Sequence, residues 1–154
     1  MVIIMKVYFI FDLKEEFIKL YKGNEIVHYN ILKQINFLDK EELAFAYNLF
    51  SHLTNPIEKV EIDRKIFLKY HQDIPYSKKN QTHYINNLYK NEISRLEVKK
   101  SYIKLESEQP FSTFFSIIKN FSENYFVCDF QNQNYFFLSE DTSLQTIYIP
   151  TYII

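Results

Sequence analysis

The chain has 154 residues, and this length alone predicts a single domain. Hydrophobic residues make up 47% of the chain and charged residues 24%, which is enough apolar material for a core and excludes a disordered chain. The net charge of −1 argues against a protein that binds nucleic acids mainly through phosphate contacts.

The rarest residues exclude several kinds of site. The single glycine, Gly23, excludes a glycine-rich phosphate-binding loop and a glycine-flanked nucleophile elbow. The single cysteine, Cys128, excludes an intrachain disulfide and a cysteine-based zinc cluster, and its apolar neighbours predict an inert, packed thiol. The histidines are far apart and none lies in an HExxH motif; they are His28, His52, His71 and His83. We therefore expect no enzyme, no cofactor and no metal, although a metal site of histidines and carboxylates assembled in space stays open.

The N-terminus lacks the pattern of a secretion signal. No basic region precedes the apolar opening, Lys6 interrupts it, and no small-residue cleavage site follows. No stretch reaches the roughly 18 apolar residues of a membrane span. We expect a monomeric, cytoplasmic protein that does not interact with membranes.

The opening of the chain predicts a strand followed at once by a short helix. Residues 5–11 form an unbroken run of β-branched and aromatic residues, which is typical of a strand buried on both faces. Asp12 and Glu15 have capping-box spacing and predict the start of a helix. Gly23 predicts its end, because glycine adopts the left-handed conformation at C′ without a steric cost.

Two longer helices are predicted next. The first covers residues 25–38, and the second begins at Asp39, where Glu42 completes another capping box. The second ends at Asn55, because a residue before proline is pushed out of the helical region. Their apolar stripes are Val27, Ile31, Ile35 and Leu38, and then Leu43, Ala46, Tyr47, Phe50 and Leu53.

The second half of the chain predicts two hairpins with a helix between them. Residues 57–70 alternate loosely and are predicted to be extended, and residues 83–92 are predicted to form a short helix. The first hairpin covers residues 95–106, a phenylalanine-rich helix starting at a proline covers 110–121, and the second hairpin covers 125–138. The apolar positions of the first hairpin and of this helix are expected to lie in the core.

This order of elements predicts an α+β fold, with a mixed sheet and two β-hairpins packed against helices. We expect residues 1–140 to form the single domain. The apolar tail, residues 141–154, is expected to be an edge strand or a segment that docks on another surface.

Three stretches of the sequence resemble one protein family, the SirA family of sporulation inhibitors of replication. Residues 8–25 read YFIFDLKEEFIKLYKGNE, an aromatic strand that runs into KEEF, a tyrosine, a glycine and an acid. Residues 53–57, LTNPI, are similar to the family's I-T-x-P-I motif, and residues 125–138 resemble its C-terminal hairpin. The three stretches occur in the family's order, and together they span residues 5–138.

The resemblance implies an inhibitor that binds the N-terminal domain of the replication initiator DnaA during sporulation. The family's contact positions fall on Phe17 and Tyr21, and a third contact, a glutamine in the family, falls on Leu49. The opening helix has an apolar arc of roughly 160°, wider than the roughly 100° that packing on one sheet requires. Leu20 lies in this arc, so we assign Phe17, Leu20, Tyr21 and Leu49 to the partner-binding surface. The alternative is that Phe17 and Tyr21 are core residues.

A second function stays open at this point. The C-terminal hairpin carries aromatic residues that could stack on the bases of single-stranded nucleic acids. They are Phe126, Phe130, Tyr135 and Phe137. The sequence shows no basic groove around them, so direct nucleic-acid binding is not the expected function.

Overall fold

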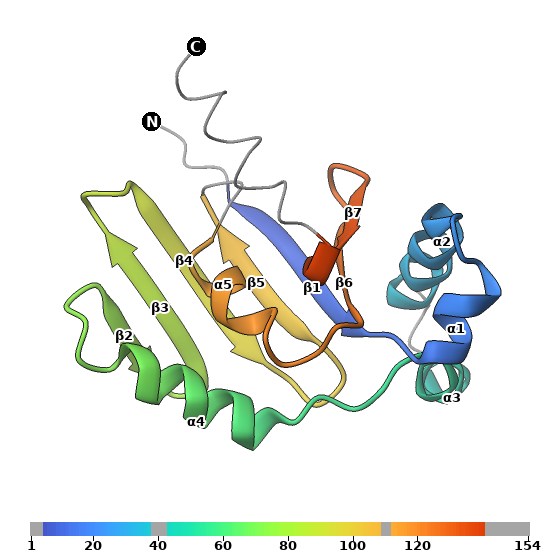
Figure 1. Ribbon diagram of the computed structural model, residues 1–154, viewed down its shortest axis with the longest axis horizontal. Helices are drawn as coiled ribbons and strands as arrows, with labels where there is room; N and C mark the ends of the chain where they lie inside the picture. Colours follow the sequence, from blue (N-terminus) through green and yellow to red (C-terminus); the bar gives the residue numbers. More distant parts are fainter. Residues whose placement is uncertain (1–4, 38–42, 109–111, 141–154) are drawn as a thin grey trace, which may run out of the picture.

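The computed structural model describes residues 5–37, 43–108 and 112–140 of the chain. A seven-stranded antiparallel sheet runs through these residues, with the strand order β2-β3-β4-β5-β1-β6-β7 (Figure 1). The strands are β1 (Lys6–Asp12), β2 (Tyr76–Lys79), β3 (Thr82–Asn87), β4 (Glu92–Val98), β5 (Ile103–Ser107), β6 (Tyr125–Asp129) and β7 (Asn134–Phe137). The helices are α1 (Glu15–Leu20), α2 (Glu25–Asn36), α3 (Leu43–Leu53), α4 (Lys59–Tyr70) and α5 (Phe114–Ile118), followed by a 3₁₀ turn, Leu138–Glu140. The α+β class is confirmed.

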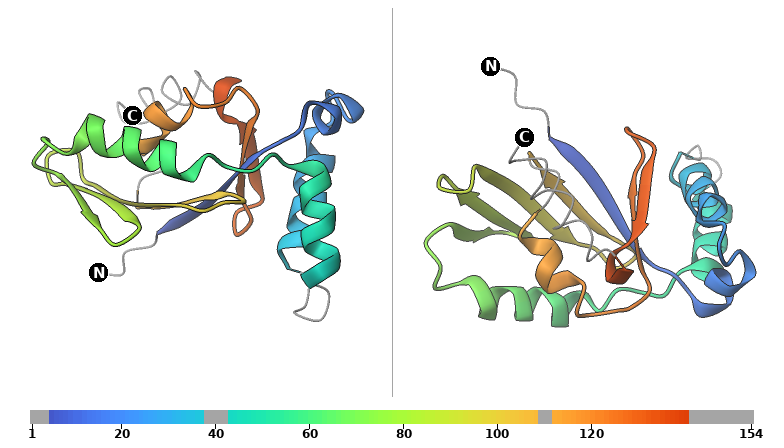
Figure 2. Two further views of the ribbon diagram at one scale, coloured as in Figure 1. Left: turned by 90° about the horizontal axis from the view of Figure 1, so that it is seen from below. Right: turned by 45° about the horizontal axis from the view of Figure 1, so that its top comes forward.

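Helices cover the two faces of the sheet at different places. Helices α4 and α5 lie on one face, over the half of the sheet that ends at β2 (Figure 2). Helices α1, α2 and α3 gather at the opposite end of the molecule, beside β6 and β7. The sheet therefore separates two hydrophobic clusters, one on each face.

Strand β1 belongs to both clusters. Tyr8 and Ile10 point into the cluster under α4 and α5, whereas Phe9 and Phe11 point into the cluster under α1–α3. Side chains alternate along a strand, so a strand covered on both faces must be apolar at every position. The prediction of a strand buried on both faces is confirmed.

The two clusters differ in their residues. The isoleucine-rich cluster, under α4 and α5, consists of Tyr8, Ile10, Ile57, Ile62, Ile66, Tyr70, Tyr76, Ile85, Leu96, Val98, Ile103, Leu105, Phe114, Phe115, Ile117, Ile118, Tyr125, Val127 and Leu138. The aromatic cluster, under α1–α3, consists of Phe11, Leu13, Phe17, Tyr29, Leu32, Phe126, Cys128 and Phe130. The predicted core positions of the first hairpin and of α5 thus lie in the isoleucine-rich cluster.

The prediction of extended structure for residues 57–70 is wrong, since most of this stretch is helix α4. Ile62, Ile66 and Tyr70 are four residues apart and all buried, which is the spacing of one helix face. The alternation that suggested a strand also included Val60 and Leu68, which are exposed on α4.

The predicted helix at residues 83–92 is also wrong, because this stretch contains β3 and the turn to β4. His83 and Ile85 are buried, whereas Tyr84 is only partly buried, which is the two-residue alternation of a strand. The turn holds Asn91 at a φ of 51°, a conformation that asparagine tolerates.

The start of α1 differs from the predicted capping box. Asp12 is the last residue of β1 and accepts a hydrogen bond from the Ser122 hydroxyl at 3.0 Å, so it does not cap α1. The N-cap residue is Lys14, which makes no side-chain capping bond. Burial raises the pKa of Asp12, and its hydrogen bonds from Ser122 and Asn55 partly oppose the shift.

Gly23 has a φ of +82°, so the predicted left-handed conformation is confirmed. It does not follow α1 directly, because this helix ends at Leu20. Instead it belongs to the turn between α1 and α2, which the Asn24 N–H closes by donating to the Tyr21 carbonyl at 2.9 Å.

The remaining predictions agree with the structure in part, and the predicted stripe of α3 is wrong at Tyr47, which is 74% exposed. Helices α2 and α3 and both hairpins are present, and α3 ends at Leu53, before Pro56.

The sheet is antiparallel throughout and not mixed, because every pair of neighbouring strands described here runs in opposite directions. The buried face of α2 differs from the predicted stripe and consists of His28, Tyr29, Leu32 and Ile35. Four predicted features lie outside the described residues: Leu38, the capping box of Asp39 and Glu42, the start of the 110–121 helix, and the tail at 141–154.

Candidate protein interface

Backbone hydrogen bonds fix where α1 leaves the sheet. The Lys14 N–H donates to the Leu53 carbonyl at 2.9 Å, and the Asn55 N–H donates to the Asp12 carbonyl at 2.7 Å. Leu13 and Thr54 form an isolated antiparallel bridge between these bonds. The start of α1 is therefore joined to the end of α3, and the segment that contains Asn55 has a structural role.

Phe17 is a core residue, with only 4% of its surface exposed. Its ring belongs to the aromatic cluster and lies edge-on to that of Tyr21, with the centroids 6.3 Å apart and the planes at 90°. The structure thus brings the two predicted contact residues together. For Phe17 it supports the alternative of a core position, because the side chain that lies one turn before Tyr21 faces β6 and α2.

His28 joins α1 to α2, and the sequence interpretation gave it no role. It is 1% exposed, and its Nε2 lies 2.9 Å from the Phe17 carbonyl oxygen, to which it can donate a hydrogen bond. Its ring lies edge-on to Phe17 at 4.6 Å and to Tyr21 at 5.8 Å. The signal in the sequence is a polar residue on the face of α2 that also carries Leu32.

The other three predicted residues reach the surface. Leu20, at the end of α1, is 70% exposed, and Tyr21 is partly exposed above the ring of Phe17. Leu49 is partly exposed on α3 and does not belong to the aromatic cluster. Ile26, in the first turn of α2, is also exposed. An apolar surface thus lies at the junction of α1 and α2, with Phe17 and His28 packed beneath it.

The C-terminal hairpin turns its aromatic side chains inward. Phe126 and Phe130 are buried in the aromatic cluster, and Tyr135 and Phe137 are partly buried against it. Tyr135 lies against Tyr29 of α2 with the ring centroids 5.1 Å apart. These rings fill the space between the sheet and α2, so they are not arranged as a platform for bases.

The described residues were compared with three kinds of functional feature: a reactive thiol, a metal site and a membrane span. Cys128 is completely buried, and burial raises the pKa of its thiol well above its ordinary value, so the predicted inert thiol is confirmed. Within the described ranges, no group of three or more His, Cys, Asp and Glu side chains is placed to hold a metal ion. None of the helices in that part of the chain has both the length and the hydropathy of a membrane-spanning segment.

Comparison with models of known protein families gives a match over most of the chain. The model of the family described as sporulation inhibitor of replication protein SirA matches residues 6–140. The chain belongs to the SirA family. This match contains all three stretches on which the resemblance rested, and it also spans residues 58–92, where α4 and β3 lie. A search of curated proteins found no match to the chain.

Proposed function

We propose that this SirA-family protein acts in the cytoplasm and inhibits the initiation of DNA replication during sporulation by binding the N-terminal domain of DnaA. The family description supports the regulatory role. The observation that carries the proposed contact is the exposed apolar surface at the end of α1, where Leu20 is 70% exposed. Large apolar side chains that are exposed together are typical of protein-binding surfaces.

The proposed contact residues have different roles. Tyr21 and Leu20 touch the partner directly, and Tyr21 supplies a large ring with a hydroxyl that can remain hydrated at the rim. Phe17 and His28 support Tyr21 from below through edge-on ring contacts. Leu49 extends the surface onto α3, and leucine in place of the family's glutamine makes this contact apolar.

Substitutions on α1 test this proposal. We expect Tyr21→Ala and Leu20→Ala each to weaken binding of the DnaA N-terminal domain by about 1–3 kcal/mol, as central interface residues do. The melting temperature should change little in Leu20→Ala, because this side chain is exposed. Isothermal titration calorimetry at two salt concentrations measures the effect, and an apolar contact should depend only weakly on salt.

The chain offers matched control variants for both substitutions. Leu88 and Tyr89 are exposed in the turn between β3 and β4, at the other end of the sheet. Leu88→Ala and Tyr89→Ala should bind DnaA as wild type does. A folded Leu20→Ala/Tyr21→Ala double variant that binds at wild-type strength would rule out this surface.

A further inference from the structure

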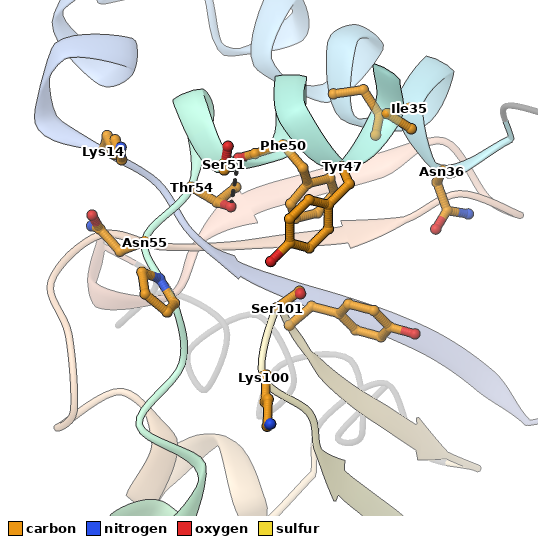
Figure 3. Close-up of a pocket in the computed structure, with 13 residues that line it drawn as sticks. Lys14, Ile35, Asn36, Tyr47, Phe50, Ser51, Thr54, Asn55, Lys100 and Ser101 are labelled. Atoms are coloured by element: carbon orange, nitrogen blue, oxygen red, sulfur yellow. Dashed lines mark hydrogen bonds between the residues drawn. The ribbon is translucent and has the colours of Figure 1, made fainter. Parts of the chain in front are cut away.

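A pocket of about 490 Å³ lies between α3 and the turn that joins β4 to β5 (Figure 3). This volume is within the range of about 300–1,000 Å³ typical of small-molecule sites. Tyr47 and Phe50 line it from α3, and Ser101 and Tyr102 line it from the turn. The Tyr47 side chain extends from α3 toward Ser101.

Three aromatic rings belong to the described lining of the pocket, and two of them pack on rings of β1. Phe50 packs on Phe11 with the centroids 5.4 Å apart, and Tyr102 packs on Phe9 at 5.7 Å. Tyr47 is 74% exposed and makes no ring contact with any residue that the structure describes. A large exposed ring beside two fixed ones leaves space for a flat apolar group.

The described lining of the pocket carries positive charge. Lys14 and Lys100 belong to it, and the lining residues that the structure describes include no aspartate or glutamate. Neither lysine forms an ion pair with a residue in the described ranges. The Lys14 backbone N–H donates to the Leu53 carbonyl, which fixes the backbone of this lysine beside the pocket. A ligand that suits both the rings and the charge has an aromatic body and an anionic group.

We propose that this pocket binds an aromatic organic anion, such as an arene carboxylate or sulfonate. The aromatic part lies against Tyr47 and Tyr102, and the anionic group faces the lysines. This site is separate from the proposed DnaA surface, because Tyr47 and Leu49 are two residues apart on α3 and so point about 200° apart around the helix. The proposal does not depend on DnaA binding.

The test compares two fluorescent probes that differ mainly in charge. 8-Anilinonaphthalene-1-sulfonate is the anionic probe, and N-phenyl-1-naphthylamine is its uncharged counterpart. We expect the anionic probe to saturate a single site on the full chain and to bind more tightly than the neutral probe. Absence of saturable binding, or equal affinity for both probes, would overturn the proposal.

Variants assign the binding to this pocket. Tyr47→Ser should weaken binding of the anionic probe about tenfold, because an aromatic contact is lost from an exposed position where the fold is not at risk. Lys14→Gln with Lys100→Gln should weaken the anionic probe by about threefold to tenfold and leave the neutral probe unchanged. Tyr89→Ser and Lys78→Gln with Lys79→Gln are the matched controls, and they should behave as wild type.

Unchanged affinity for the anionic probe in Tyr47→Ser would show that the dye binds elsewhere and would overturn the proposal. Displacement of the dye by the DnaA N-terminal domain would assign the pocket to a protein partner and would also overturn it. If DnaA does not bind the chain at all while the probes behave as expected, the pocket stands and only the proposed function fails.

Discussion

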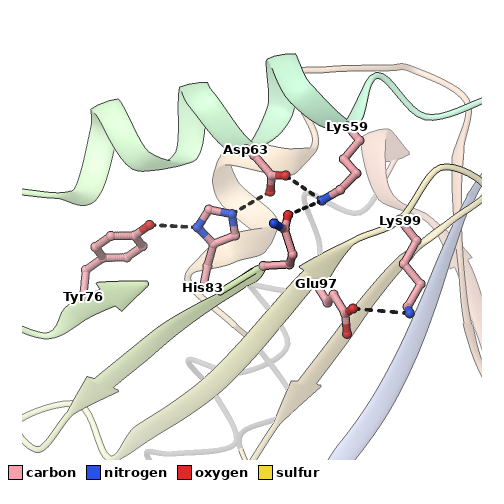
Figure 4. Close-up of polar contacts among 7 residues, drawn as sticks. Lys59, Asp63, Tyr76, His83, Glu97 and Lys99 are labelled. Carbon is pink, nitrogen blue, oxygen red and sulfur yellow. Dashed lines mark hydrogen bonds and ion pairs between the residues drawn. The ribbon is translucent and has the colours of Figure 1, made fainter. Parts of the chain in front are cut away.

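The two faces of the sheet bury polar groups in different ways. On the α4 face a chain of hydrogen bonds connects three elements (Figure 4). The Tyr76 hydroxyl is 2.7 Å from His83 Nδ1, and His83 Nε2 is 2.7 Å from an Asp63 oxygen. Asp63 also accepts from Lys59 at 2.8 Å, and Lys59 donates to Gln81 at 3.0 Å. Burial raises the pKa of Tyr76 to about 12, which keeps its hydroxyl protonated and able to donate.

Of the three buried side-chain polar atoms that lack a hydrogen-bond partner among the described residues, two lie on the α1–α3 face, and the third is the Tyr70 hydroxyl on the α4 face. His28 Nε2 bonds to the Phe17 carbonyl, but His28 Nδ1 and the Tyr29 hydroxyl have no hydrogen-bond partner among the described residues. Burial raises the pKa of Tyr29. Packed rings, and not a polar network, hold this face together. Hydrogen bonds of fixed geometry therefore join α4 to the β2–β3 hairpin on one face. On the other face, packed aromatic rings lie beneath an exposed apolar surface.

The largest expected effect tests whether the two faces fold as one unit. Phe17→Ala in the aromatic cluster and Phe114→Ala in the isoleucine-rich cluster should each lower the free energy of unfolding by about 3–5 kcal/mol, because each empties a buried aromatic position. Both variants should unfold in a single transition, since β1 contributes to both clusters. Urea titrations followed by far-UV circular dichroism and by tyrosine fluorescence measure this.

Transitions that differ between the two probes would show that the two faces do not unfold as one unit. A loss below about 1 kcal/mol in Phe17→Ala would contradict its assignment to the core. Phe17→Ala should weaken DnaA binding together with a large loss of stability, because it also removes the ring beneath Tyr21, whereas Leu20→Ala should weaken binding with little loss of stability.

The second-largest effect is expected when a substitution breaks the polar network of the α4 face. Asp63→Leu removes the acceptor of His83 and the partner of Lys59, so a buried N–H is left without a bond. We expect the free energy of unfolding to fall by about 1–3 kcal/mol, the cost of an unsatisfied buried polar group. Glu61→Gln is the control in the same helix, because Glu61 pairs with Arg64 at the surface and its loss should leave stability nearly unchanged. Equal stability of Asp63→Leu and wild type in urea would mean that the network contributes little.

The pH dependence of stability should report the same network. Burial lowers the pKa of His83, and the hydrogen bond with Asp63 opposes this only in part. The folded state therefore binds fewer protons than the unfolded chain, so stability is highest above about pH 6.5 and falls as the pH decreases below that value. In His83→Gln this contribution is absent, so the stability difference between the two proteins should shrink on acidification. A difference that stays constant between neutral and acidic pH would contradict the assignment.

The smallest effect on stability is expected in the turn that joins α1 to α2. Gly23→Ala should lower the free energy of unfolding by about 1 kcal/mol, because alanine at positive φ has a steric cost. An added Cβ meets no atom within 4 Å, so the cost comes from the backbone alone. Lys22→Ala, one residue earlier, is the control and should leave the urea midpoint unchanged. Equal midpoints for Gly23→Ala and wild type would exclude the strain.

Local patterns predicted the elements whose neighbours in the chain are also their neighbours in space. The hairpins around Ser101 and Gln133 could be predicted because their strands are adjacent in sequence and their inward positions alternate. The predictions failed at α4 and β3, where the same apolar residues fit both a loose alternation and a helical stripe. There the choice depends on the partner, since Ile62 and Ile66 become one face only when β4 is beneath them.

The sequence by itself determined the α+β class, a β1 that is apolar on both faces, the left-handed conformation at Gly23 and the family to which the chain belongs. Tertiary structure decided which side of α1 is core. The apolar arc of α1 is too wide for local periodicity to divide, and in the structure Phe17 is 4% exposed whereas Leu20 is 70% exposed. It also decided that His28 lies under Tyr21, because α2 folds back on α1 after the turn at Gly23, and that Tyr47 and Tyr102 line one pocket, because these two residues meet through long-range packing that no spacing along the chain encodes.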